Sequence, residues 1–478
     1  MLFNTILFRS LLVILLLQVA SALYAQQEIE KQRAIILTDI SYFEPDDAQS
    51  LVRLLLYSNQ IDIEGIIATT NETRRYSIYP EIIFNELDQY EKVRPNLLKH
   101  EQGYPTADEL RAVVKNGHPL YGMQGVGKDK GSEGSEWIIK MLQKKDERPL
   151  WVTVWGGASV LAQALWKIDH TMSASQKKQL ISKLRVYAIS DQDDSGHWIR
   201  KNFPNLFYIV SPGAYIQGTW IGMNKVTPGA NNEVVSNYWV AENVQQGHGA
   251  LGSCYPSVVF GLEGDTPSFL YLLPNGLNSP EHPDWGSWGG RYELKKPEFV
   301  DNPKAQVKMQ PEGRAIWTNA DDTFTPTIEA KYGRSVQNDT ITVTDHTVTI
   351  WRWREEIQND FAARLDWCVN EYESANHPPV AKLKGLSEIT VKSDSIFLLN
   401  ATPSYDPDGD GLIYYWFCYK EAGTSPMPGM LFPPNVVCPT AKAPKVDKPC
   451  TIHYILKLTD RGTPRLTRYA RLIVHVEP

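Results

Sequence analysis

The first part of the chain alternates short apolar runs with segments of helical periodicity. Helical patterns cover residues 50–57, 78–90 and 158–166, and apolar runs lie at residues 34–38, 61–70, 150–155, 184–189 and 207–210. Runs of this length between helical patterns are typical of buried strands. The repeated strand–helix units predict an α/β domain over residues 33–300, with a mostly parallel sheet that helices cover on both faces.

The pattern changes after residue 300 and again after residue 375. Residues 340–350 alternate as a strand does, and residues 351–372 have the character of one long helix. We expect residues 301–375 to form an extension packed on the first domain. The sequence Asn376-His377-Pro378-Pro379 breaks any helix and marks a linker. Short β-like runs beyond it predict a small all-β sandwich of the immunoglobulin-like type over residues 376–478.

Residues 1–25 have the pattern of an export signal. Arg9 precedes an apolar core at residues 11–17, and small residues follow around Ala20 and Ala25. This order predicts a cleaved signal peptide, so we expect the mature protein to be secreted or periplasmic. The apolar core is too short to span a bilayer comfortably, and no later segment approaches that length. We therefore expect no stable membrane insertion.

Composition narrows the class of partner. Lys and Arg number 48 against 55 Asp and Glu, the net charge is −7, and we find no dense basic patch, so nucleic acid is not an expected partner. Of the 14 tryptophans, those in glycine-rich loops are Trp155, Trp220, Trp285 and Trp288. Indoles on loops offer flat apolar faces to sugar rings, and burial in a large core is the alternative.

Acidic residues gather where the first predicted strand ends. Asp39 ends the apolar run, and Asp46 and Asp47 open the helical segment that follows. Carboxylates concentrated at one sheet edge repel one another unless a hard cation such as Ca²⁺ or Mg²⁺ lies between them. The alternative is a helix N-terminus at which acids complement the dipole. Ligands bind at the carboxyl ends of parallel strands, where we also expect Asn71, Trp155 and Asp191.

Three separated motifs resemble the inosine–uridine nucleoside hydrolase superfamily. They are Asp39 with Asp46-Asp47-Ala48 and residues 63–71, the glycine-containing turn at residues 154–162, and the segment 263–273. A closer resemblance, over nearly the whole mature chain, is to secreted bacterial cellulose-binding proteins with a nucleoside hydrolase-like domain. The motifs that carry it are residues 44–47, 155–157, 274–277, 281–285, 351–355 and 406–410.

The resemblance implies a calcium site. Asp39, Asp46, Asp47 and Asp265 would ligate the ion, helped by a backbone carbonyl near Val154, and Asp39 would also act as general base toward a metal-activated water. Asn71 would hydrogen-bond a sugar hydroxyl. The further candidate substrate contacts are Trp155, Asp191, His282 and Trp285.

The chain departs from the superfamily pattern at three places. Leu37 stands where the superfamily has an acid, residues 40–45 form a longer loop before the Asp pair, and Gly264 stands where nucleoside-specific members often have a His. These departures argue against nucleosides as substrates. We therefore expect an exported Ca²⁺-dependent glycosidase, acting on a furanoside or a polysaccharide-derived sugar. The alternative is a non-catalytic carbohydrate (cellulose)-binding protein on the same scaffold.

The C-terminal region has an acidic turn of its own, Asp406-Pro407-Asp408-Gly409-Asp410. It resembles the acidic turn of cadherin-like and polycystic-kidney-disease-type modules, which suggests a second Ca²⁺ site. Asp and Gly are also the usual residues of an ordinary tight turn. We favour the ordinary turn and keep the calcium site as the alternative.

Overall fold

The computed structural model describes residues 30–478 except 214–218, 300–306, 327, 330–334 and 337–340. The predicted signal peptide, residues 1–25, lies outside the described residues. Residues Gln32–Pro478 form one compact unit, to which the following description refers.

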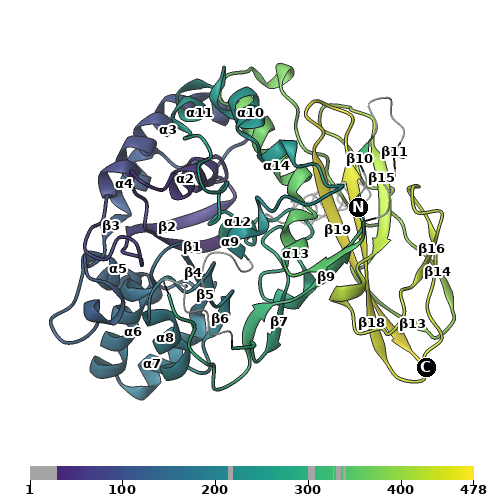
Figure 1. The fold of residues 1–478 in the computed structure, drawn as a ribbon. Helices are drawn as coiled ribbons and strands as arrows, with labels where there is room; N and C mark the ends of the chain where they lie inside the picture. Colours follow the sequence, from purple (N-terminus) through teal and green to yellow (C-terminus); the bar gives the residue numbers. More distant parts are fainter. Residues whose placement is uncertain (1–29, 214–218, 300–306, 327, 330–334, 337–340) are drawn as a thin grey trace, which may run out of the picture. The chain divides into compact units, whose positions relative to one another are not determined.

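An eight-stranded sheet forms the centre of the first domain (Figure 1). Its strand order is β3-β2-β1-β4-β5-β6-β8-β7, and its neighbouring strands run parallel except for β7 with β8. The strands are β1 (Gln32–Thr38), β2 (Ile61–Ala68), β3 (Val114–Asn116), β4 (Leu150–Val154), β5 (Leu184–Ala188), β6 (Phe207–Val210), β7 (Tyr292–Lys295) and β8 (Ile316–Asn319). The mostly parallel sheet predicted from the apolar runs is confirmed.

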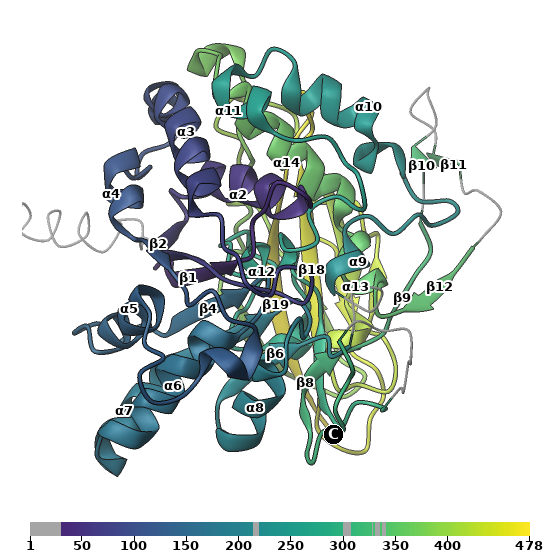
Figure 2. The ribbon, with the colours of Figure 1, turned by 60° about the vertical axis from the view of Figure 1, so that its left-hand side comes forward.

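Strand β1 shows why both sheet faces are covered. Ala34 and Ile36 belong to one hydrophobic core, and Ile35 and Leu37 belong to another, because successive side chains of a strand point to opposite faces. The helices over the first core are α2 (Asp46–Leu56), α3 (Pro80–His100), α4 (Ala107–Ala112) and α11 (Gly249–Cys254). Those over the second are α5 (Glu133–Leu142), α6 (Ser159–Thr171), α7 (Ala174–Lys183) and α8 (Ser195–Asn202) (Figure 2).

The region between the two domains departs from the predicted single helix. In place of one helix over residues 351–372, two helices form, α13 (Val348–Trp351) and α14 (Arg354–Asp366). The Trp353 N–H donates to the Ile350 carbonyl at 3.0 Å in a tight turn, and its ring packs 5.7 Å from that of Tyr469. Helix α14 packs on α2, where Arg53 Nη1 donates to the Ile357 carbonyl at 3.3 Å.

Short elements complete the first domain and the extension. They are η1 (Gly122–Gly125), α9 (Thr219–Gly222), η2 (Glu233–Val235), α10 (Asn237–Val240), η3 (Ala241–Gln245), α12 (Pro267–Leu270), η4 (Pro283–Trp285), β9 (Asp322–Phe324), β10 (Ile328–Glu329), β11 (Ser335–Val336), β12 (Val343–Asp345) and η5 (Tyr372–Ser374). Among the helices that the structure describes, none is both long enough and apolar enough to cross a membrane.

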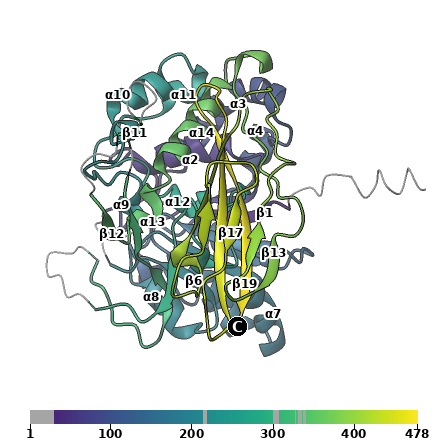
Figure 3. The same ribbon diagram turned by 90° about the vertical axis from the view of Figure 1, so that its right-hand side faces the viewer.

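Two antiparallel-rich sheets build the C-terminal domain (Figure 3). The four-stranded sheet has the order β13-β19-β18-β15, and the three-stranded sheet has the order β14-β17-β16. The elements are β13 (Glu388–Lys392), β14 (Ile396–Leu398), β15 (Ile413–Cys418), η6 (Lys420–Ala422), β16 (Met430–Phe432), β17 (Thr440–Lys442), β18 (Cys450–Thr459) and β19 (Thr467–Glu477). Buried residues of both sheets, such as Ala441 and Leu456, share one core, so the predicted all-β sandwich is confirmed.

Candidate functional site

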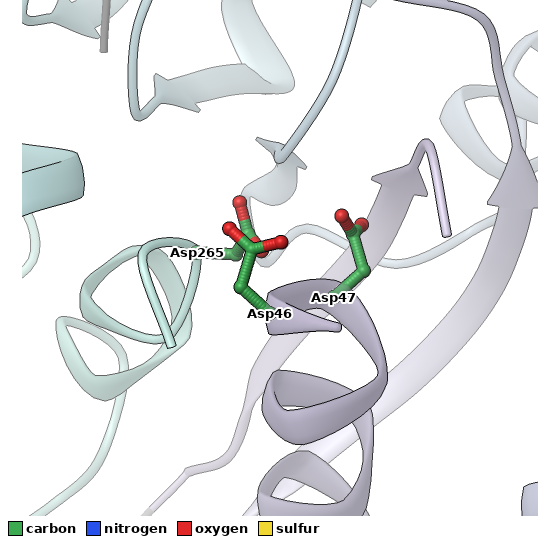
Figure 4. A group of neighbouring side chains, drawn as sticks. All are labelled: Asp46, Asp47 and Asp265. Atoms are coloured by element: carbon green, nitrogen blue, oxygen red, sulfur yellow. The ribbon is translucent and has the colours of Figure 1, made fainter. Parts of the chain in front are cut away.

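Three buried aspartates meet at the carboxyl edge of the central sheet. Asp46 and Asp47 form the first turn of α2, and Asp265 lies in the turn before α12, across from them (Figure 4). Each offers a carboxylate oxygen, and these oxygens lie within 4.8 Å of one another. The structure therefore brings together residues that are more than two hundred positions apart in the sequence.

A buried ion pair holds Asp265 against α2. Glu263, which is fully buried, accepts a hydrogen bond from Arg53 Nη2 at 3.0 Å. The Glu263 N–H donates to Gln49 Oε1 at 3.0 Å, and the hydroxyls of Thr266 and Ser50 are 3.0 Å apart. Because Gln49, Ser50 and Arg53 all lie on α2, these contacts fix the turn that carries Asp265 beside the first turn of that helix.

Asp39, directly after β1, lies near this group but is not one of the three residues whose oxygens lie within 4.8 Å of one another. The Asn71 amide donates to Asp39 Oδ2, and the charge of Asp39 adds to the larger effect of burial that raises the pKa values of Asp47 and Asp265. A Cβ on Gly156 would lie 2.3 Å from Asp39 Oδ1, so only glycine leaves room for that carboxylate. The Trp155-Gly156-Gly157 turn thus has a steric function in the site.

Several carboxylate oxygens in the cluster are buried without a hydrogen-bond donor among the described residues. They are Asp39 Oδ1, Asp46 Oδ1 and Asp265 Oδ2. Two other carboxylate oxygens of the cluster have hydrogen-bond donors. Trp220 Nε1 donates to Asp46 Oδ2 at 2.9 Å, and the Thr38 hydroxyl donates to Asp47 Oδ1. Burying an unpaired carboxylate is costly, so this arrangement calls for a counter-charge.

The pKa values of the four aspartates also indicate that the cluster needs a positive counter-charge. Burial is the largest cause that raises the pKa of Asp39, Asp46, Asp47 and Asp265 above the ordinary value. Neighbouring negative charges add to the rise for Asp39, Asp47 and Asp265. A hard divalent cation prefers such carboxylate oxygens and would restore their ionised form. The four aspartates therefore fit a cation such as Ca²⁺ as oxygen donors, while the calcium site itself stays a prediction.

Two further acids near the site were not among our candidates. Burial and the charge of Asp46 raise the pKa of Glu44 to about 7. Burial raises the pKa of Asp193 to about 6, and its unpartnered Oδ2 lies 2.4 Å from where a Cβ on Gly157 would be. Glu44 belongs to the motif of residues 44–47, so the sequence contained a signal that could have identified it as a site residue. Asp193 lies in a polar loop that resembles a solvated turn.

Three predicted residues lie in or under the cluster with their polar groups engaged. The Asn71 side-chain oxygen accepts the Arg74 N–H at 2.6 Å, so both ends of this amide have protein partners. Trp155 is fully buried, and its indole N–H donates to Ser268 Oγ at 2.8 Å beneath Asp265. The Val154 carbonyl accepts the Ile189 N–H at 3.1 Å. Trp155 thus supports the site from below and presents no face to a ligand.

The remaining predicted contacts have partners elsewhere. Asp191 forms a bidentate ion pair with the buried Arg200, with N–O distances of 2.7 and 2.8 Å. His282 stacks on Trp285 at a ring-centroid distance of 3.8 Å, and Trp285 meets His453 of β18 edge-on at 4.9 Å.

The neighbouring Glu281 pairs with Arg185, the second residue of β5, at 2.9 Å. The stretch that contains His282 and Trp285 therefore lies near the amino end of β5 and against the C-terminal domain, whereas the acids follow the carboxyl ends of the strands.

A steric contact explains why position 264 is a glycine. A Cβ at this position would lie 2.2 Å from Cδ1 of Trp220, because the indole lies directly against the Gly264 backbone. A Cβ on Gly261 would likewise come within 3.3 Å of Cη2 of the same ring. The indole that donates to Asp46 thus occupies the space that a side chain before Asp265 would need. Trp220 was noted in the sequence as a loop tryptophan, but its contact with the cluster comes from the tertiary structure.

Comparisons with known proteins agree with this architecture. The model of the family described as "Cellulose-binding Sde182, nucleoside hydrolase-like domain" matches residues 33–292, and that of "Cellulose-binding protein Sde0182, C-terminal domain" matches residues 396–476. No curated protein matches the chain.

A solved structure is similar over 94% of this chain and 100% of its own, with 33% identity and a TM-score of 0.77. It is described as a nucleoside hydrolase-related hypothetical protein from Saccharophagus degradans that is associated with carbohydrate metabolism. The resemblance stated from the sequence is thereby confirmed. The chain belongs to the cellulose-binding Sde182 family, with a nucleoside hydrolase-like domain followed by the C-terminal domain of that family.

Proposed function

We propose that this chain is an exported carbohydrate-binding protein that takes a cellulose-type β-glucan at the carboxyl edge of its central sheet, with a Ca²⁺ ion in the aspartate cluster. The observation that carries the proposal is the set of buried, closely spaced carboxylates with unpartnered oxygens. The family description supplies the class of glycan, and the predicted signal peptide supplies the location.

One set of residues would bind the ion, and a second set orients the carboxylates that bind it. Asp39, Asp46, Asp47 and Asp265 would provide the carboxylate oxygens. Thr38, Asn71 and Trp220 each bind a second carboxylate oxygen and so fix the orientation of the carboxyl groups. A bound Ca²⁺ accepts six to eight oxygen ligands, so it offers positions for sugar hydroxyls and water beyond the protein carboxylates.

Hydrolysis is the second candidate function, and a specific observation favours it. Asp39 Oδ1 is buried and unpartnered, so it is available to accept a proton from a water that attacks the anomeric carbon. Glu44, whose charge interacts with that of Asp46, would be the candidate proton donor to the leaving oxygen. Both groups would be needed for a glycosidase of this type.

Isothermal titration with cellohexaose separates these functions. We expect the wild-type chain to bind this oligosaccharide at least about tenfold more tightly with Ca²⁺ than with a chelator, because the ion would contribute contacts to the sugar. Equal binding under both conditions would refute a cation-dependent sugar site. Release of reducing ends by the wild type, and its loss in Asp39→Asn, would establish hydrolysis as well.

A further inference from the structure

The loop that joins Asp39 to Asp46 presents two large aromatic side chains to solvent. Tyr42 is 65% exposed and Phe43 is 62% exposed. Tyr76, in the loop after β2, is 65% exposed as well. Exposed apolar side chains that form one contiguous patch usually mark an interaction site. Tyr42 and Phe43 lie in the loop of residues 40–45, which the sequence comparison marks as longer than in the superfamily.

Contacts with neighbouring residues hold the side chains of Tyr42 and Phe43. The ring of Tyr42 meets that of Tyr79 edge-on, with centroids 5.6 Å apart. The Arg74 guanidinium lies over the Phe43 ring at 4.4 Å from its centroid. Rings held by protein contacts lose less conformational entropy when a ligand binds, which favours their use as a binding surface.

Hydrogen bonds link the loops that carry Tyr42, Phe43 and Tyr76 to the aspartate cluster. Arg74, which covers one face of Phe43, donates its backbone N–H to Asn71 Oδ1 at 2.6 Å. Asn71 in turn donates to Asp39. Because β1 and β2 are neighbouring parallel strands, the loops that follow them emerge side by side at the same sheet edge. A ligand on the aromatic rings is therefore next to the cluster.

The loop before Asp265 repeats the pattern. Val259 and Phe260 are 65% and 68% exposed, and they precede Asp265 along the chain. The loop is held by Gln49 Nε2, which donates to the Pro256 carbonyl at 3.1 Å, and by Asn237 Oδ1, which accepts the Val258 N–H at 2.7 Å. Each of the two loops that lead into the cluster thus exposes apolar side chains just before an aspartate.

We propose that Tyr42, Phe43 and Tyr76, here called the aromatic platform, bind consecutive glucose units of a linear β-glucan while a further unit lies at the aspartate cluster. The inference rests on the proposed function and extends it, because it assigns the ligand as a chain of several sugars. The flat C–H faces of β-linked glucose pack on aromatic rings, which combine a large apolar area with few rotatable bonds.

The charges around the platform are compatible with a neutral ligand. Charges of both signs border the platform: Glu44 adjoins Phe43, the Arg74 guanidinium lies over the Phe43 ring, and Arg75 precedes Tyr76. This mixed border suits a neutral glucan, whose hydroxyls can donate to the carboxylate and accept from the guanidinium groups. A neutral glucan thus meets both the apolar and the polar parts of the surface.

The test compares cellohexaose with cellobiose by titration in Ca²⁺. In Tyr42→Ala/Phe43→Ala, we expect cellohexaose affinity to fall at least about tenfold, while cellobiose affinity changes less because fewer sugar units reach the platform. Tyr42→Phe/Phe43→Tyr keeps both rings and should retain binding. Phe432→Ala, which removes an exposed ring from the C-terminal domain, is the matched control and should also retain binding.

The outcomes separate the two levels of the proposal. Unchanged cellohexaose affinity in Tyr42→Ala/Phe43→Ala would overturn the aromatic platform and leave the cation-dependent sugar site standing. A change in sedimentation coefficient with unchanged glucan binding would assign the rings to a protein contact and would also overturn it. Failure of the wild type to bind cellohexaose in Ca²⁺ would refute the proposed function itself. Titration of Ca²⁺ alone, with equal affinity in both chains, would show that the cluster is intact in the variant.

Discussion

Among the described residues, two groups of three aspartates place carboxylate oxygens close together, and the surroundings of the two groups differ. In both groups, Asp46 with Asp47 and Asp265, and Asp406 with Asp408 and Asp410, the candidate oxygens lie within 4.8 Å of one another. The first group is buried, whereas Asp408 is exposed and its two neighbours are half-buried. Proximity of carboxylates therefore does not distinguish the two groups, and the distribution of hydrogen-bond donors does.

The exposed group is largely satisfied by its own turn and by the linker. Asp406 Oδ1 accepts the backbone N–H groups of Asp408 and Asp410 at 2.9 and 3.0 Å, although its Oδ2 has no donor among the described residues. Asp408 accepts the backbone N–H of His377 at 2.7 Å and contacts its ring nitrogen at 2.9 Å. These contacts favour the ordinary Asp/Gly turn, and calcium binding there stays an untested alternative.

The exposed turn has a structural role, because it holds the linker between the two domains. His377 of the linker contacts His100, the last residue of α3, with a ring-nitrogen distance of 2.9 Å. Asp408 thus anchors the linker to the first domain through His377. In the buried group, Asp46 and Asp265 each retain a buried oxygen without a donor among the described residues. Identical residue types therefore perform a connecting role in one region and form the proposed cation site in the other.

Removal of one carboxylate from each group should give the largest difference. Asp265→Asn should lower Ca²⁺ affinity more than about 100-fold, because the buried site loses both a ligand and a charge. Asp410→Asn, the matched change in the exposed turn, should alter it less than about threefold. Isothermal titration of Ca²⁺ measures both variants. Equal losses would mean that the two groups are equivalent as cation sites.

The pH dependence of stability should differ with and without a cation. Because the pKa values of Asp39, Asp47 and Asp265 are raised in the folded state, the folded chain binds more protons than the unfolded chain above the ordinary pKa of 3.8. Without a cation, stability should therefore fall as pH rises from about 5 to 8, by about 1.4 kcal/mol for each unit of pKa shift within that window.

Thermal unfolding in chelator and in Ca²⁺ measures this dependence. Added Ca²⁺ should raise the melting temperature most at pH 8, where the carboxylates are ionised, and least at pH 5. Asp410→Asn should leave this difference unchanged. A melting temperature in chelator that rises from pH 5 to pH 8 would contradict the raised pKa values.

A pair of glycine substitutions should separate site damage from general destabilisation. Gly156→Ala places a Cβ 2.3 Å from Asp39 Oδ1, so it should destabilise by about 1–3 kcal/mol and weaken Ca²⁺ binding. Gly409→Ala, at φ +83° with no described atom within 4 Å of its Cβ, should cost a similar ~1–2 kcal/mol through backbone strain. Its Ca²⁺ affinity should stay at the wild-type value. Urea unfolding and Ca²⁺ titration together test both variants.

The smallest effect should come from the hydrogen bond between Trp220 and Asp46. Trp220→Phe keeps an aromatic ring against Gly264 but removes the N–H that donates to Asp46 Oδ2. We expect a loss in Ca²⁺ affinity of about three- to tenfold, since one ligand carboxylate is less firmly oriented. His377→Phe, which removes a partner of Asp408 in the exposed turn, should lower stability without this loss. The same Ca²⁺ titration distinguishes them.

The fold was predictable because its signals are local. Apolar runs as long as a strand, such as that in β4, are buried at every residue, and the periodic segments after them became helices on both faces. The break at Trp353 was not predictable, because the residues around it have helical character and the ring is drawn toward Tyr469 more than a hundred positions away. Tertiary packing overrides local propensity in such places.

The candidate site divides in the same way. Asp39, Asp46 and Asp47 lie within one strand–loop–helix unit, so the sequence alone predicts that they are close together. Asp265 was added only by the resemblance of its motif. His282 and Trp285 lie in a loop whose composition resembles that of a ligand-binding loop, yet it packs near the amino end of β5 and on the C-terminal domain.

What the sequence determined by itself is therefore the α/β scaffold, the sandwich after it and the three acids around the first loop. What only the tertiary structure decided is which polar groups lack partners and which aromatic rings reach solvent. Trp155 is buried beneath the cluster, Trp220 lies against Gly264 at Asp46, and Tyr42 and Phe43 are exposed beside it. The physical reason is that burial and hydrogen bonding depend on segments far apart in the chain, whereas periodicity depends on neighbours.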